Sequence, residues 1–169
     1  SLESLTVLRS TVANFFTAVA HHVVQGRIVF PGAGYLEIAR AAAAAGSALG
    51  GVFFLQPLAI DASGLVVECA VVESGFEVCS SEGIDAMADA TVHCSGTLAA
   101  SNDYLQRGEH VTVFHASSCA HAVHLSAMYD GFHTVGLQYG PRYRTLTQVW
   151  AGSGAAAARL RARPTREGT

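Results

Sequence analysis

One histidine and one helix start lie close together in this sequence, and together they could carry out acid–base chemistry. His22 precedes a short apolar run, and Pro31 follows it ahead of an alanine-rich stretch. An imidazole titrates near neutral pH, with a reference pKa of about 6.5, so it can take up a proton and return it. The first N–H groups of a helix lack intrahelical acceptors and carry partial positive charge. This one segment can therefore supply both a base and a site for negative charge.

The element that must position this pair is a helix that we predict over residues 31–45. Proline suits the first turn of a helix, where its missing N–H costs nothing. The residues that follow Pro31 are strong helix formers, and Gly46 is a natural stop. His22 itself is expected in an extended segment, with His21 pointing to the opposite side and serving a structural or solvent-facing role.

Two motifs give the chain a resemblance to a known family. His22, Gly26 and Pro31 match the pattern HxxxGxxxxP, with similar flanking residues at 30–37. This pattern resembles that of the dehydratase domains of modular polyketide synthases and animal-type fatty acid synthases. Residues 136–146 resemble the YGPxF region of the same dehydratases, with Tyr143 in place of the phenylalanine. The two motifs occur in the order and roughly the spacing that the family shows.

The fold class that we predict is α+β, a hotdog fold in which an antiparallel sheet wraps a central helix. β-branched and apolar runs follow the helix, and Ser74-Gly75 is short enough to connect a hairpin. Residues 46–51 are expected to form a loop. The expected strands cover residues 5–8, 52–60, 65–73, 76–79, 87–98, 147–151 and 155–163, and a short helix is expected at 126–135. We predict a first lobe with its connector over residues 1–125 and the beginning of a second lobe over residues 126–169.

The resemblance implies a function and a set of site residues. It implies a type I polyketide synthase dehydratase domain, a lyase that removes water from a 3-hydroxyacyl chain to give an enoyl thioester. His22 would be the catalytic base, and the N–H of Gly32 would bind the thioester carbonyl, with Gly34 as the alternative. Tyr139 would reach the active site with its hydroxyl. The expected substrate-binding residues are Gly26, Pro31, Gly32, Tyr139, Gly140 and Pro141.

The resemblance also implies partners and a missing acid. The substrate would be carried on the phosphopantetheine of an acyl carrier protein, with no cofactor or metal, beside neighbouring synthase domains; a homodimer is left open. Family members take an aspartate from a DxxxQ or DxxxH motif in the second lobe. The sequence stops at Thr169, before that helix is expected, so we predict a chain that lacks the acid and is inactive alone. Asp89 and His93 fit DxxxH literally, but they lie in an expected first-lobe strand.

Composition bounds the other classes of function. Half of the 169 residues are hydrophobic, which is enough for a core. The net charge is −3 and the sequence has no run of basic residues, so we do not expect nucleic acid to be the main partner. No apolar run approaches the roughly 18 residues of a membrane helix. The four cysteines form no CxxC pair and read as buried, reduced thiols of a cytoplasmic protein. The histidines that invite a metal interpretation lack a recognisable ligand set, so we predict no metal at His110, His115, His121 and His124.

Three alternatives to the dehydratase interpretation stay open. A product-template cyclase shares the double hotdog and its His/Asp pair but runs aldol closures. A non-catalytic scaffold that binds acyl chains or partners fits a chain without the aspartate. A single-hotdog hydratase or thioesterase is the third, and the YGP segment argues against it.

Overall fold

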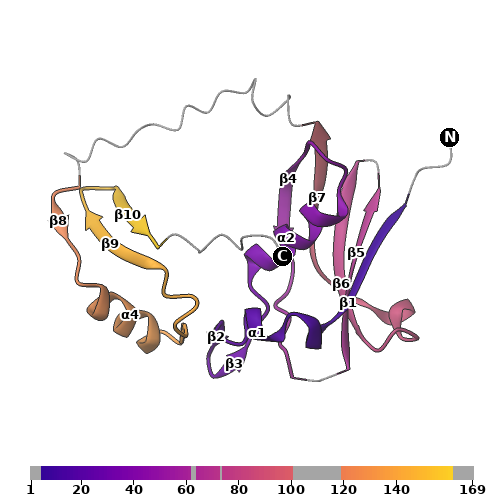
Figure 1. Cartoon of the computed structure of the whole chain (residues 1–169), viewed down its shortest axis with the longest axis horizontal. Coiled ribbons are helices and arrows are strands. Elements are labelled where there is room, and N and C mark those ends of the chain that lie inside the picture. The colour runs from indigo at the N-terminus through magenta and orange to yellow at the C-terminus, as the bar shows by residue number, and fades with distance from the viewer. Residues whose placement is uncertain (1–4, 62–63, 73, 101–118, 162–169) are drawn as a thin grey trace, which may run out of the picture.

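The computed structural model describes residues 5–61, 64–72, 74–100 and 119–161. Its main feature is an antiparallel five-stranded sheet in the order β1-β5-β6-β7-β4. Helix α2 lies against one side of this sheet and contacts β1, β4, β5 and β6 (Figure 1). The strands are β1 (Thr6–Thr11), β4 (Ser47–Phe54), β5 (Leu65–Val72), β6 (Gly75–Glu82) and β7 (Thr91–Ala100). This arrangement is the expected hotdog fold.

The chain enters the sheet and leaves it through short elements. A 3-10 turn η1 (Val12–Asn14) and a one-turn helix α1 (Phe16–Val19) lead from β1 to a hairpin of β2 (Val23–Val24) and β3 (Arg27–Ile28). Another 3-10 turn, η2 (Met87–Asp89), connects β6 to β7. Residues 87–89 were expected to begin the strand, so that prediction was wrong by four residues.

Helix α2 runs over Gly32–Ala42 with Pro31 as its N-cap. Its predicted end at residue 45 is wrong, because Ala43 already has an extended backbone with ψ 156°. The expected loop at residues 46–51 is also wrong. Gly46, with φ +83°, turns the chain, and β4 begins at Ser47 so that its first residues can pair with the end of β7.

The core lies between one face of α2 and the sheet. Tyr35 and Ala39 are the fully buried residues of the helix, whereas Ala33, Glu37, Arg40 and Ala41 are exposed. The sheet contributes alternating inward positions, which include Val67, Cys69, Val78 and Cys94. The expectation of a largely buried helix therefore holds for one face of α2 only.

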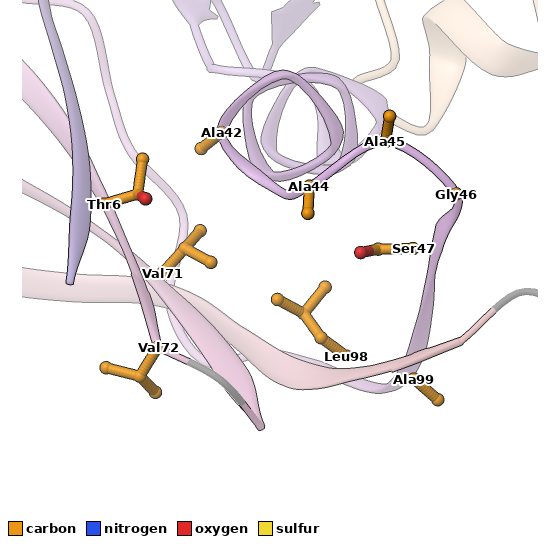
Figure 2. A pocket seen from close by; sticks show the side chains of 10 residues that line it. All are labelled: Thr6, Ala42, Ala44, Ala45, Gly46, Ser47, Val71, Val72, Leu98 and Ala99. Atoms are coloured by element: carbon orange, nitrogen blue, oxygen red, sulfur yellow. The ribbon is translucent and has the colours of Figure 1, made fainter. Parts of the chain in front are cut away.

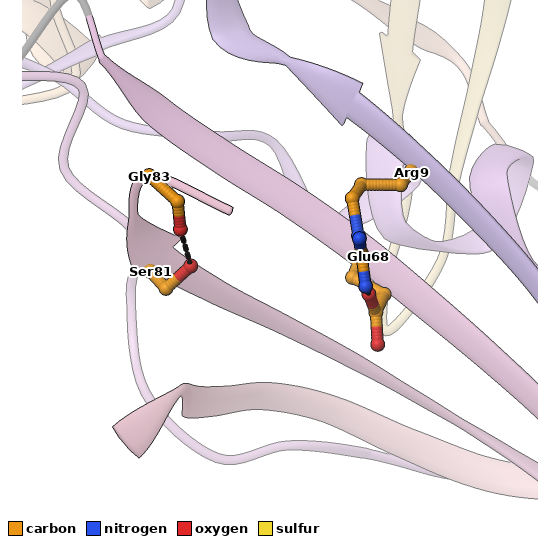
Figure 3. A network of polar contacts seen from close by, with 4 residues as sticks. All are labelled: Arg9, Glu68, Ser81 and Gly83. Atoms are coloured by element: carbon orange, nitrogen blue, oxygen red, sulfur yellow. Dashed lines mark hydrogen bonds and ion pairs between the residues drawn. The ribbon is translucent and has the colours of Figure 1, made fainter. Parts of the chain in front are cut away.

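Two polar side-chain contacts accompany the backbone pairing of the sheet. Arg9 of β1 donates from Nε to Glu68 of the neighbouring β5 at 2.6 Å, and the two side chains form an ion pair (Figure 3). The Ser81 hydroxyl donates to the Gly83 carbonyl at 2.7 Å and fixes the turn after β6. Exposed ion pairs of this kind stabilise a fold by at most about 1 kcal/mol, so they orient strands more than they stabilise them.

A cavity of about 430 Å³ lies between the end of α2 and the sheet (Figure 2). Small and aliphatic side chains line it, among them Ala42, Ala44, Val71 and Leu98. It opens at the end of the helix opposite Pro31. The cavity is therefore separate from the predicted active-site residues.

The second segment builds its own small sheet in the order β10-β9-β8. Its elements are β8 (His121–Ala122), α4 (Leu125–Thr134), β9 (Leu146–Ala151) and β10 (Ala156–Leu160). In Figure 1 the segment between α4 and β9 faces the β2–β3 hairpin, and the small sheet lies farther from it. The first strand of the sheet precedes residue 126, and the division of the chain into two lobes stays a prediction.

Candidate active site

His22 lies just before β2 and not inside a strand, and the backbone around it is fully paired. Its N–H donates to the Val19 carbonyl at 2.8 Å, and its carbonyl accepts the N–H of Val29 at 3.0 Å. Ring atom Nδ1 lies 2.7 Å from the Val29 carbonyl oxygen. A carbonyl can only accept, so Nδ1 carries the hydrogen of the neutral ring and Nε2 keeps its lone pair. The ring is therefore oriented as a base that acts through Nε2.

The second segment packs directly on this histidine. The ring of Tyr139 stacks on the His22 ring at a centroid distance of 5.3 Å and an angle of 25°. The Tyr143 ring lies 5.1 Å from the same imidazole, tilted by 50°. Residues separated by more than a hundred positions in the sequence thus form one aromatic cluster, in which the imidazole is partly buried.

Backbone hydrogen bonds hold the second segment against the β2–β3 hairpin. Gln25 donates to the Gly136 carbonyl at 2.7 Å, Gln138 donates to that of Val23 at 2.8 Å, and Gly140 donates to that of His21 at 2.8 Å. Val24 and Leu137 form an isolated antiparallel bridge. This ladder continues the hairpin edge and brings Tyr139 over His22.

The two predicted glycines of the motifs have backbone roles. Gly26 and its neighbour Gln25 have φ values of +77° and +48°, which is the two-residue turn that suits a twisted hairpin. The N–H of Gly26 donates to the Gln138 side chain at 2.8 Å. A Cβ on Gly140 would lie 2.8 Å from the Cβ of His21, so only glycine fits this contact.

His21 has the structural role expected of it, and Tyr143 has a role that the sequence did not indicate. Nδ1 of His21 accepts the N–H of Arg142 at 3.3 Å, next to the exposed Pro141. The Tyr143 hydroxyl donates to the Ala18 carbonyl at 3.2 Å. A phenylalanine in the family position could not make this bond, and the tyrosine itself was the signal that could have revealed it.

Of the two glycine N–H groups expected as donors at the start of α2, one is already bonded. Pro31 is buried and provides no side-chain cap, and the N–H of Gly34 donates to the Pro31 carbonyl at 2.8 Å. That bond rules out Gly34 as the alternative donor. Within the described ranges, the N–H of Gly32 has no hydrogen-bond acceptor. The N–H of Gly32 therefore stays available as a donor.

His93 and Tyr35 belong to the core and not to this site. Both ring nitrogens of His93 have partners, the Gln56 carbonyl at 3.1 Å and the Ser80 hydroxyl at 2.8 Å. Burial lowers the pKa of His93, and the Gln56 carbonyl opposes that change. Burial raises the pKa of Tyr35 to about 12. Asp89 is exposed in η2, so the literal DxxxH match pairs a surface carboxylate with a core imidazole.

The cysteines and the remaining histidines show no site among the described residues. Burial raises the pKa of the Cys69 thiol to about 11, and it also raises the pKa values of the Cys79 and Cys94 thiols. His121 lies in β8 and His124 precedes α4, so the two do not share a helix face. No group of three or more potential metal ligands occurs in the described residues, and His110 and His115 lie outside them. No helix in the described part of the chain is long and apolar enough to cross a membrane.

Sequence comparisons agree with both motifs. A model described as "Polyketide synthase dehydratase domain" matches residues 3–81, and one described as "Polyketide synthase dehydratase N-terminal domain" matches residues 111–169. The chain is 37% identical over 160 residues to polyketide synthase ThaG of Burkholderia thailandensis, which covers 86% of this chain. It is 31% identical over 141 residues, 79% of the chain, to mycoketide-CoA synthase of Mycobacterium tuberculosis. The chain spans 3% of the length of each of these proteins.

Solved structures show the same fold. The dehydratase domain from the CurF module of curacin polyketide synthase superposes with a TM-score of 0.74 at 22% identity, over 95% of this chain and 62% of that one. A trans-AT dehydratase domain from Brevibacillus brevis gives a TM-score of 0.71 at 23% identity, over 95% of this chain and 60% of that one. The chain therefore spans about three fifths of each of these solved domains.

Proposed function

The chain belongs to the family of polyketide synthase dehydratase domains, and from that premise we propose that it takes part in removing water from a 3-hydroxyacyl thioester. The observation that carries this proposal is the bond between Nδ1 of His22 and the Val29 carbonyl, at 2.7 Å. It leaves Nε2 as the basic atom of a partly exposed ring. Members of this family are lyases that act on hydroxyacyl chains held by an acyl carrier protein.

Each residue has a defined role in the proposed reaction. Nε2 of His22 removes the α-proton, and negative charge develops on the thioester oxygen. The N–H of Gly32 donates to that oxygen at the positive end of α2. Tyr139 forms a wall of the site, and Gly26, Gly140, Pro31 and Pro141 shape the segments that meet there. A general acid then protonates the β-hydroxyl group, and water leaves to give the enoyl thioester.

We propose that the general acid is not one of the described residues. No carboxylate among them shares a hydrogen bond or an ion pair with His22. General acid assistance is typically worth about 10²–10⁴-fold, and hydroxide is a poor leaving group. A polypeptide that carries only these residues would therefore dehydrate a hydroxyacyl thioester slowly or not at all. No cofactor or metal takes part in the proposed reaction.

Charge in the second segment suits a substrate on a phosphopantetheine arm, which carries a phosphodiester. Four arginines of residues 119–161 are exposed, against the single acidic residue Asp130; they are Arg142, Arg144, Arg159 and Arg161. Arg142 and Arg144 flank Tyr143, whose ring contacts His22. We propose an acyl carrier protein and the neighbouring synthase domains as partners on this basis.

The experiment that tests the function compares two polypeptides that extend from this chain through the next lobe of the natural protein. One has the natural sequence and the other carries His22→Ala. We expect turnover of a 3-hydroxyacyl thioester by the first and a loss of at least about 10²-fold in the second. Equal turnover by both would contradict the assignment of the base. Aldol closure of a poly-β-keto chain without dehydration would favour the cyclase instead.

A further inference from the structure

Phe54 occupies an unusual position at the end of β4. It pairs directly with Cys94, and directly opposed residues of antiparallel strands share one face of the sheet. Cys94 is completely buried in the core, so Phe54 lies on the face of the sheet that carries the core. Its side chain is nevertheless 57% exposed. The core face of the sheet therefore extends beyond the area that the rest of the described chain covers.

The Phe54 ring lies against the start of α2. A Cβ built on Gly32 would be 3.3 Å from Cε1 of this ring, and the Tyr35 ring centroid is 6.3 Å from that of Phe54. The neighbouring backbone is held in place, because the N–H of Leu55 donates to the His93 carbonyl at 2.8 Å. An aromatic ring thus lies next to Gly32, whose N–H has no acceptor in the described residues.

His22 lies within reach of the same place. Val29 bonds to His22 through both its N–H and its carbonyl, and Gly32 follows it by only three residues. Three extended residues span at most about 11 Å, so the N–H donor of Gly32 lies within about that distance of the Val29 carbonyl that holds the base. The donor suits the thioester oxygen, and the ring suits the hydrocarbon next to it.

We propose that Phe54 is a specificity-determining residue whose ring packs on the carbon chain of the acyl thioester. This inference rests on the proposed function and deepens it, because it names a residue that contacts the acyl chain and distinguishes chain lengths. A long chain continues across the exposed ring and gains a large contact, whereas a short chain covers only the part of the ring nearest Gly32. Phe54 therefore favours long-chain over short-chain substrates.

The matched control is Phe53, the preceding residue of the same strand. It pairs with Ser95, and it is 64% exposed on the opposite face of the sheet. Phe54→Ala, Phe54→Leu and Phe53→Ala are made in the longer polypeptide that contains the next lobe. The value of kcat/KM is measured for a long-chain and a short-chain 3-hydroxyacyl thioester, and the melting temperature reports folding.

We expect Phe54→Ala to lower the ratio of long-chain to short-chain kcat/KM by about 10-fold or more, because one lost apolar contact changes discrimination by that order. Phe54→Leu should lower it less, and Phe53→Ala should leave it unchanged. An equal loss on both substrates, or the same ratio in both alanine variants, would overturn the inference. A change in oligomeric state with an unchanged ratio would assign Phe54 to a protein interface and would overturn it too.

A binding measurement separates this inference from the proposed function. Stabilisation of the polypeptide by an inert long-chain acyl thioether is compared between the natural sequence and the two alanine variants. If no variant dehydrates but Phe54→Ala alone weakens this binding, the proposed function fails and the acyl wall stands. If dehydration depends on His22 while binding is the same in all three, the function stands and the acyl wall is wrong.

Discussion

Two histidines of the first segment use a backbone carbonyl in the same way but differ at the second nitrogen. In His22, Nδ1 bonds to the Val29 carbonyl, and no partner of Nε2 occurs in the described residues. In His93, the Gln56 carbonyl and the Ser80 hydroxyl occupy both nitrogens, and the side chain is almost completely buried. Of these two histidines, His22 therefore has the available nitrogen and the access to a substrate.

The buried His93 predicts a pH dependence of stability. Its pKa is lowered by burial, so the unfolded chain binds a proton at a higher pH than the folded chain does. The free energy of unfolding should be insensitive to this group above the unfolded pKa of about 6.5 and should fall as the pH drops below it. When unfolding by denaturant is measured between pH 7.5 and 5, the free energy of unfolding should change less with pH in His93→Gln than in the natural sequence. The exposed His121→Gln is the control, and an equal change in both variants would refute the prediction.

At the scale of elements, the start of α2 depends on a close contact between a glycine and a buried ring. A Cβ on Gly34 would lie 2.6 Å from Cε1 of Phe30, which packs against Tyr35 and Phe15. Phe30 is buried and its N–H bonds to the Leu58 carbonyl, so the ring has little freedom to move. The glycine therefore serves packing, and its N–H closes the first turn of the helix.

Gly34→Ala should lower the free energy of unfolding by about 1–3 kcal/mol, because it overpacks this contact. Gly131→Ala is the matched control, since Gly131 also lies in a helix and a Cβ there meets no atom within 4 Å. The control should be neutral or stabilising by up to about 1 kcal/mol. Chemical denaturation measures both variants. Equal stabilities would show that Phe30 can adjust.

The sequence predicted the order of elements well and their ends less well. Proline, glycine and β-branched runs located α2, β5 and β6 because these residues act through local backbone preferences. Alanine propensity favoured a longer helix over residues 43–45, but pairing of β4 with β7 requires the chain to reverse there. Residues 47–51 are mostly small and have little strand propensity, so the sequence predicted a loop there. They are extended because they pair with β7.

The candidate site was predictable in part. The spacing of His22, Gly26 and Pro31 identified the first segment, and the resemblance alone associated Tyr139 with it. No local rule indicates a stacking contact between residues so far apart in the sequence. Which N–H at the helix start is available depends on the first helical turn, and the Tyr143–Ala18 bond depends on how the second segment docks. Neither the available N–H nor this hydrogen bond can be predicted without the three-dimensional packing.

At the scale of the whole molecule, the surroundings of the proposed base depend on how the second segment meets the first. Its contacts concentrate on the turn and hairpin around His22, where His21, Val23 and Gln25 all bond to residues 136–140. Arg142 adds a bond from its side chain to the Thr17 carbonyl at 3.0 Å. One short interface therefore determines both the docking of the segment and the surroundings of the proposed base.

The tautomer of the His22 ring decides whether it can act as the proposed base, because a base that acts through Nε2 must carry its hydrogen on Nδ1. Nitrogen-15 NMR of the imidazole rings, recorded at a pH where the neutral form dominates, distinguishes the two nitrogens, and His22→Ala assigns the signals. We predict a protonated Nδ1 and an unprotonated Nε2 for His22, because Nδ1 lies 2.7 Å from the Val29 carbonyl oxygen. A His22 ring that carries its hydrogen on Nε2 would contradict it.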